Sequence, residues 1–247
     1  MALMGKYANP DEVQFLLDEQ KQDGSWSVFP VGDPQYASSY GTAWAILGLN
    51  AQLQLGLADE NYASKIANSV QKGAAWLIAH RDHGSRWKDY PLVRSGKLSE
   101  SISGVVLHAL HMTMPQEQLG QLDSGWLDGL PATTVKVTDA DHPYVWLKTK
   151  DGVDENDDFV QIRLPWLVIG TADAYRNGGI IQRAKALAWL EQSIAQDDVL
   201  AADTTPDNWW RAELLLSLGY VLERRQRYPA QQIIPADREK AVLFHAR

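Results

Sequence analysis

The chain has 247 residues, a formal net charge of −8 and no cysteine. The negative charge would repel a nucleic-acid backbone, and the lack of cysteine excludes disulfides, thiolate metal ligands and thiol nucleophiles. No stretch approaches the ~18 apolar residues of a membrane span, and residues 1–10 carry no apolar signal-peptide core, so we expect a cytoplasmic protein with no membrane span and no nucleic-acid partner.

The first predicted element is a helix that begins at Asn9 and ends near Gly24. Asn9 can cap the first amides, Pro10 is preset for the first helical position, and Glu12 can reach back to the cap. A large aromatic side chain, Trp26, follows directly after the helix end. We therefore expect this helix to close on a tryptophan hook.

The spacing of Phe15-Leu16, Gln20 and Gly24-Ser25-Trp26 resembles the Gln-Trp repeat of the squalene cyclase, terpene cyclase and protein prenyltransferase superfamily. The resemblance implies an all-α fold, an α/α toroid of helical hairpins in which the Gln amide stacks on the Trp and braces the next helix. The 10 tryptophans, against 4 phenylalanines, agree with a recurring Trp.

The pattern recurs along the chain, which is typical of stacked helical repeats. A second copy opens with residues 72–77 and closes on Gly84 and Trp87, with Arg81 in the Gln place and a hook one residue longer; another opens with residues 185–190. We interpret Trp146-Leu147, before Asp151-Gly152, as a degenerate intermediate copy of the repeat. The predicted structural repeat residues are Gln20, Gly24, Trp26, Trp76, Gly84, Trp87 and Trp189.

The remaining apolar periodicity predicts further helices. We expect them from Ser38-Ser39 to Gly56, from Asp59 or Asn61 to His83-Gly84, from Ser99 through Leu110, over a short stretch from 118 to 127, from Pro165 onward, from 180 to 196 and from 208 to 222. Residues 133–137 and 143–147 are β-prone and predict a small ribbon in an insertion around 131–150. The expected architecture is one toroid domain, complete or incomplete, over residues 1–225, and a C-terminal tail over 226–247.

Two histidine pairs were considered as metal ligands. His108 and His111 fall outside the apolar stripe of their helix, and that face carries no acidic residue to complete a site. His80 and His83 form another pair, so a zinc site shared between hairpins is the alternative to ordinary solvent or groove histidines. We favour the ordinary interpretation and expect no metal and no cofactor.

The candidate catalytic residues lie in an acidic segment, Glu155-Asn156-Asp157-Asp158. It is similar to the Asp-x-Asp-Asp motif of the superfamily's protonating cyclases, with Glu in place of the first Asp. Crowded carboxylates cannot all ionise, so the resemblance implies that Asp157 keeps a proton and delivers it to an isoprenoid. We favour a solvated acidic loop, because Pro165 moves the helix start downstream and the chain has room for one toroid domain only.

Two other activities of toroids were weighed. Zinc-dependent prenyl transfer needs a Cys ligand, which this chain lacks. A carbohydrate-active barrel would need two facing carboxylates, and Asp33, Asp89 and Asp157 sit in predicted loops without a spacing that selects a pair. A toroid mouth lined by Trp44, Trp166 and Trp210 would suit an apolar or sugar ligand.

The leading hypothesis is therefore a non-catalytic toroid that uses its concave face or tail to bind an apolar or isoprenoid ligand or a protein partner. The alternative is an acid-initiated isoprenoid cyclase with Asp157 as proton donor, and the third hypothesis is a carbohydrate-active α/α barrel.

Overall fold

The computed structural model describes residues 10–28, 36–54, 60–93, 98–130, 135–137, 146–148 and 164–194. Within these residues the chain is mostly helical, and it forms two compact units, Met1–Gly125 and Trp126–Arg247. The expected single domain over residues 1–225 and the tail over 226–247 stay predictions, because residues 195–247 lie outside the described part.

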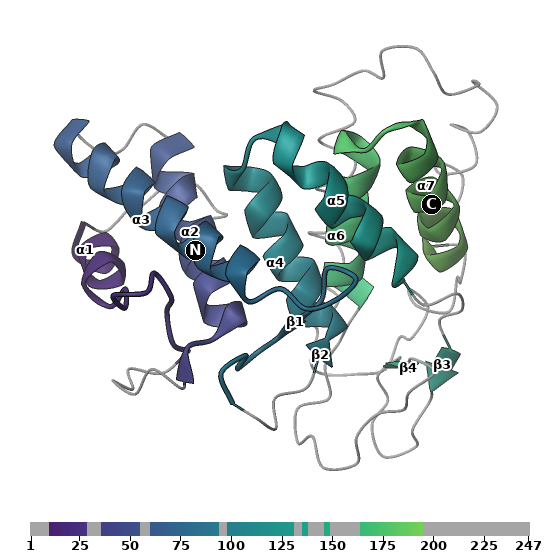
Figure 1. Cartoon of the computed structure of the whole chain (residues 1–247), viewed down its shortest axis with the longest axis horizontal. Coiled ribbons are helices and arrows are strands. Elements are labelled where there is room, and N and C mark those ends of the chain that lie inside the picture. Colours follow the sequence, from purple (N-terminus) through teal and green to yellow (C-terminus); the bar gives the residue numbers. More distant parts are fainter. Residues whose placement is uncertain are drawn as a thin grey trace, which may run out of the picture. The chain divides into compact units, whose positions relative to one another are not determined.

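The first unit is an array of helices with one small ribbon, which consists of two strands of two residues each (Figure 1). Its elements are α1 (Pro10–Asp18), α2 (Ser39–Gln54), α3 (Glu60–Ala79), β1 (Trp87–Lys88), β2 (Leu98–Ser99), α4 (Glu100–Thr113) and most of α5 (Gln116–Asp128). The strands β1 and β2 are antiparallel, with Trp87 opposite Ser99. The helix starts agree with the predicted ones to within a few residues, but α1 ends at Asp18 and α3 at Ala79, before the expected ends near Gly24 and His83-Gly84, because the last residues of each predicted segment form a turn.

The core of this unit is built around α2, which packs against both α3 and α4. The predicted apolar stripe of α3 is buried at Ile66, Val70 and Leu77, and so is the stripe of α4. Each such side chain stabilises the fold by about 1.5–3 kcal/mol relative to an exposed position. The helix α4 is buried from Ile102 to Leu110 without interruption, so it lies inside the unit rather than on its surface.

The second unit contains a helical hairpin and a β-ribbon. Its elements are β3 (Val135–Val137), β4 (Trp146–Lys148), α6 (Leu164–Asn177) and α7 (Ile180–Ile194). The antiparallel pairing of β3 with β4 confirms the ribbon that the β-prone residues predicted. The indole of Trp126 donates to the hydroxyl of Thr171 at 3.1 Å and so joins the end of α5 to α6.

None of the helices in the described ranges is long and apolar enough to cross a membrane.

Candidate ligand-binding cleft

The first hook, residues 20–26, is held by hydrogen bonds from both nitrogens of Trp26. The indole N–H donates to the carbonyl oxygen of Leu16 at 2.7 Å, and the backbone N–H donates to the Thr42 hydroxyl at 3.0 Å. The Trp26 side chain is only 2% exposed, which confirms the expected burial. Trp26 therefore ties the end of α1, through its ring, to the start of α2, through its backbone N–H.

Gln20 connects this hook to α3. Its side-chain amide donates to the carbonyl oxygens of Gly24, at 2.9 Å, and Ser69, at 2.8 Å. In return its amide oxygen accepts from the Ser69 hydroxyl at 2.5 Å. We call this pair of contacts between Gln20 and Ser69 the brace, because it fixes the loop after α1 against α3.

The second hook, residues 81–87, repeats the bonds of the first. The Trp87 indole donates to the Leu77 carbonyl oxygen at 2.7 Å, and the Trp87 backbone N–H donates to the Ser103 hydroxyl at 2.8 Å. In both hooks these acceptors lie 10 residues before and 16 residues after the Trp. The two hooks are therefore equally long, and the expectation of a longer second hook was wrong.

The equal length places Ser85 where the first hook has Gly24. Gly24 has a φ of +96° and Ser85 a φ of +53°, so both adopt the left-handed conformation. The extra glycine of the second hook, Gly84, precedes this position rather than filling it. If Gly84 is aligned with Gly24 from the sequence alone, the alignment gives the second hook one additional residue.

Each hook lies close to a glycine of the next helix but one. A Cβ on Gly73 of α3 would come within 2.8 Å of the Trp26 ring, and a Cβ on Gly125 of α5 would come within 2.8 Å of the Ser85 hydroxyl. Ser69 lies one helical turn before Gly73, and Gln121 lies one turn before Gly125. These two glycines are not equivalent, however: Ser85, in the place of Gly24, lies against Gly125, whereas Gly24 itself lies against Lys72. The buried Leu122 therefore occupies the place on α5 that the buried Ser69 occupies on α3, and Gln121 is the exposed residue beside it.

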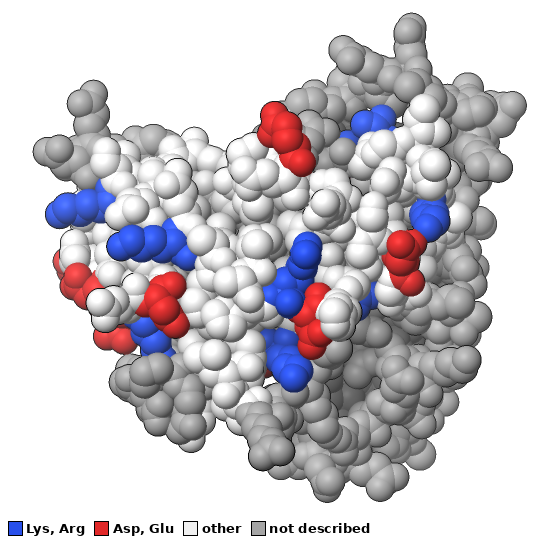
Figure 2. All heavy atoms as spheres, in the orientation of Figure 1, with Lys and Arg blue, Asp and Glu red and all other residues white. Residues whose placement is uncertain are grey.

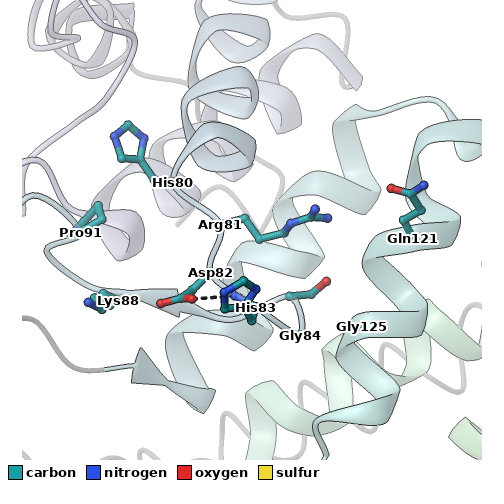
Figure 3. Close-up of a pocket in the computed structure, with 10 residues that line it drawn as sticks. His80, Arg81, Asp82, His83, Gly84, Lys88, Pro91, Gln121 and Gly125 are labelled. Carbon is teal, nitrogen blue, oxygen red and sulfur yellow. Dashed lines mark hydrogen bonds between the residues drawn. The ribbon is translucent and has the colours of Figure 1, made fainter.

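The brace is missing at the second hook. Arg81 stands in the Gln20 position, and among the described residues no hydrogen bond joins Arg81 to Gln121. An open cleft of about 700 Å³ lies here instead, between the second hook and α5 (Figure 3). Its walls are formed by His80, Arg81, Asp82, His83, Gly84, Ser85, Lys88, Pro91, Gln121 and Gly125.

The ionisable groups of the cleft are mainly basic. Arg81 and Lys88 are cationic, and within the described residues neither forms an ion pair. Asp82 is the acidic group of the lining, and its Oδ1 accepts from the backbone N–H of His83 at 2.7 Å. On the molecular face drawn in Figure 2, basic and acidic side chains are otherwise interspersed.

His80 presents one defined ring nitrogen to a ligand. Its ring stacks on Trp76, with centroids 4.3 Å apart, and its Nδ1 lies 2.9 Å from the Trp76 carbonyl oxygen. A carbonyl oxygen only accepts, so Nδ1 carries the proton. This leaves Nε2 to accept a hydrogen bond from a ligand in the neutral ring, or to donate one in the charged ring.

The histidines of α4 lie inside the protein, contrary to the expected solvent or groove positions. His108 is only 7% exposed, and the His111 Nε2 lies 2.7 Å from Oδ1 of Asp123, a buried residue of α5. The helical wheel of α4 could not show this partner, because it belongs to another helix. Within the described ranges no group of three or more His, Asp or Glu residues is placed to hold a metal ion.

Asp89 has a structural partner rather than a second carboxylate. Its Oδ1 accepts from the Ser38 hydroxyl at 2.5 Å, and its carbonyl oxygen accepts from the Ser39 N–H at 2.7 Å, so it caps α2. Burial raises the pKa of Asp89 above its ordinary value, although the hydrogen bond from Ser38 opposes this. Asp33 and Asp157, the other two carboxylates of the carbohydrate-active alternative, lie outside the described residues.

Of the other predicted catalytic and ligand-binding residues, only Trp44 and Trp166 lie in the described part of the chain. Glu155, Asp157, Asp158 and Trp210 lie outside the described residues. Trp44 is half-buried on α2, edge-on to Tyr40, and Trp166 is half-buried on α6 in the second unit. The tryptophan-lined toroid mouth and the proton-donating Asp157 stay predictions.

The sequence points to Arg81, one of the residues that line the cleft, but does not show the cleft itself. The one available signal was Arg81 in the place of a Gln, and its meaning depends on Gln121, which lies forty residues away in the sequence. Comparisons with protein families, with characterised proteins and with solved structures gave no match to this chain.

Proposed function

We propose that this chain is a helical-hairpin repeat protein of the α/α-toroid kind, similar in scaffold to the terpene cyclases and prenyltransferases, and that it acts as a binding module. The two tryptophan hooks support the repeat, because in each the indole N–H donates to a backbone carbonyl oxygen and the backbone N–H donates to a side-chain hydroxyl, at the same spacings. If the repeats close into a toroid, we expect the cleft to be the ligand site of the first unit.

The observation that carries the binding function is the open cleft at the second hook. Its volume, about 700 Å³, falls within the range of about 300–1,000 Å³ that is typical of small-molecule sites. Its lining is largely polar and charged, which favours a small polar ligand over the apolar or isoprenoid ligand expected from the resemblance.

The geometry of Ser85 supports binding rather than covalent catalysis. A serine with positive φ beside histidines can indicate a strained nucleophile. Here the same conformation occurs at Gly24 in the first hook, so the shape of the hook explains it. In addition, the Ser85 side chain packs against Gly125, where it helps to define the wall of the cleft.

The proposal is tested by NMR with three small probes of different charge: inorganic phosphate, glucose and arginine. At constant ionic strength, at least one probe at millimolar concentration is expected to shift the backbone amides of Gly84, Ser85 and Gly125. Gln121→Trp, which places a bulky ring over the cleft, should abolish the shifts. Asn68→Trp, an exposed position on α3 outside the lining, is the matched control and should leave them unchanged.

If none of the three probes moves the cleft amides, or if Asn68→Trp and Gln121→Trp have the same effect, the cleft is not the ligand site. Circular dichroism of both variants checks that each keeps its helices.

A further inference from the structure

We infer that the cleft takes an oxyanion, a phosphate or carboxylate group of a small molecule, which bridges Arg81 to α5 and so completes the brace that the second hook lacks. This inference rests on the proposed binding function and names the ligand class of the same site.

The first step is a comparison of donors and acceptors at the two hooks. At the first hook, Gln20 supplies both a donor and an acceptor. The Ser69 carbonyl oxygen accepts from the Gln20 amide N–H, and the Ser69 hydroxyl donates to the Gln20 amide oxygen. At the second hook, Arg81 supplies donors only, since a guanidinium has five N–H groups and no acceptor. A direct copy of the brace is therefore impossible there, since Leu122, in the place of Ser69, has no polar side-chain atom, and the donors of Arg81 suit a ligand rich in acceptor oxygens.

The second step concerns direction. The Arg81 side chain extends from the end of α3 toward α5, where the Gln121 side chain lies across the cleft (Figure 3). Gln121 can add amide donors from the opposite wall. A ligand with several acceptor oxygens can therefore be bound from two sides at once, whereas a cation would meet Arg81 and Lys88.

The third step concerns charge. The whole chain has a net charge of −8, yet Arg81 and Lys88 line the cleft with Asp82 as their acidic neighbour, and one Asp82 oxygen already accepts from His83. Arginine binds phosphate and carboxylate through two parallel hydrogen bonds, and lysine adds a point charge. The cleft is larger than a phosphate ion alone, which leaves room for the body of a small molecule that carries the anion.

The experiment measures the affinity of inorganic phosphate by NMR titration, with glucose as the neutral comparison at the same ionic strength. Arg81→Gln is expected to weaken phosphate binding about 10- to 100-fold, the loss of one charge-assisted hydrogen bond. Arg81→Gln combined with Gln121→Ala removes donors from both walls of the cleft, and should weaken phosphate binding further than Arg81→Gln alone. Lys65→Gln, an exposed lysine on α3 outside the lining, is the matched control and should bind phosphate like the wild type.

The possible outcomes separate this inference from the proposed function. If glucose or arginine shifts the cleft amides and phosphate does not, the cleft is a ligand site but its ligand is not an oxyanion. If phosphate binds with the same affinity to the wild type and to Arg81→Gln, the bridge through Arg81 is wrong. If no probe shifts the cleft amides, both proposals fail.

Discussion

At the scale of single residues, the fold depends on two large buried side chains, each of which donates a hydrogen bond to one specific acceptor. The indoles of Trp26 and Trp87 are buried, and each donates to a carbonyl oxygen at the end of the preceding helix. Those carbonyls belong to the last turns of α1 and α3, where helical backbone acceptors have no partner within the helix. The two tryptophans thus combine apolar burial with helix capping.

Trp26→Phe and Trp87→Phe should each reduce the free energy of unfolding by about 2–4 kcal/mol, because they leave a small cavity and a helix-end carbonyl without its donor. Urea unfolding measures the loss. Tyr36→Phe, which changes an exposed side chain, is the control and should stay within about 0.5 kcal/mol of the wild type. Losses at the two tryptophans no larger than the control would mean that the hooks do not hold the fold.

His111→Ala should cost about 3–5 kcal/mol of unfolding free energy, because it leaves the buried Asp123 carboxylate without the ring that faces it. Replacing both residues by leucine should cost less than the single change, since no isolated charge then remains. His83→Ala, at an exposed position, is the control for losing a histidine. Urea unfolding at neutral pH distinguishes these variants, and equal losses for His111→Ala and His83→Ala would contradict the role of the buried pair.

At the scale of elements, the hook is a turn whose shape is set by backbone conformation and close approach. Gly24 and Gly84 both have positive φ, but their surroundings differ. A Cβ on Gly24 would lie 2.7 Å from the Lys72 carbonyl oxygen, whereas a Cβ on Gly84 would lie 3.5 Å from the Gly125 carbonyl oxygen. Only the first glycine is required by both conformation and space.

Gly24→Ala should therefore destabilise by about 2–5 kcal/mol, the sum of the left-handed strain and a backbone clash, and Gly84→Ala by about 1–2 kcal/mol, the strain alone. Thermal or urea unfolding of both variants compares them directly. A larger loss at Gly84 than at Gly24 would show that the close approach of the first hook to α3 is not tight.

Two aspartates of these turns should give opposite dependences of stability on pH. Burial raises the pKa of Asp23, but hydrogen bonds from Ser25 and Trp76 outweigh it and bring the pKa below 3.8, while burial keeps the pKa of Asp89 above 3.8. A lowered pKa stabilises the fold above the unfolded-state pKa, and this stability is lost as the pH falls through the folded pKa. A raised pKa stabilises the fold below the unfolded-state pKa, and this stability is lost as the pH rises through the folded pKa.

Urea unfolding between about pH 3 and pH 7 tests this with Asn variants, since Asn keeps the shape and an acceptor oxygen. Asp23→Asn should cost most near neutral pH and progressively less in acid. The free energy of unfolding of Asp89→Asn should be lowest relative to that of the wild type in acid. It should increase relative to the wild type as the pH rises. The same slope for both variants would contradict the assigned pKa directions.

The sequence predicted the elements better than their contacts. Capping residues and apolar spacing identified α1, and the stripe of α4 predicted its core face, because both are properties of one segment. His111 was misplaced because its partner, Asp123, comes from α5 and a single-helix wheel contains no other helix. The cleft was missed for the same reason: the replacement of Gln20 by Arg81 is visible in the sequence, but its effect depends on which residue of α5 faces it.

At the scale of the whole molecule, an acidic chain carries a locally basic cleft on its first unit. Long-range repulsion by the net charge of −8 opposes anion binding, and salt screens it over about 10 Å at 0.1 M ionic strength. The short-range contacts of Arg81 and Lys88 must therefore supply the affinity, and moderate salt should weaken phosphate binding less than it would on a surface patch.

The most direct test of the central claim is amide hydrogen exchange of the full chain with and without inorganic phosphate at constant ionic strength. We expect exchange to slow in residues 80–91 and in the part of α5 around Gln121, because the anion joins these two segments, and to stay unchanged in α6 and α7. Unchanged exchange at the second hook, or slowing confined to segments outside the cleft, would contradict the account.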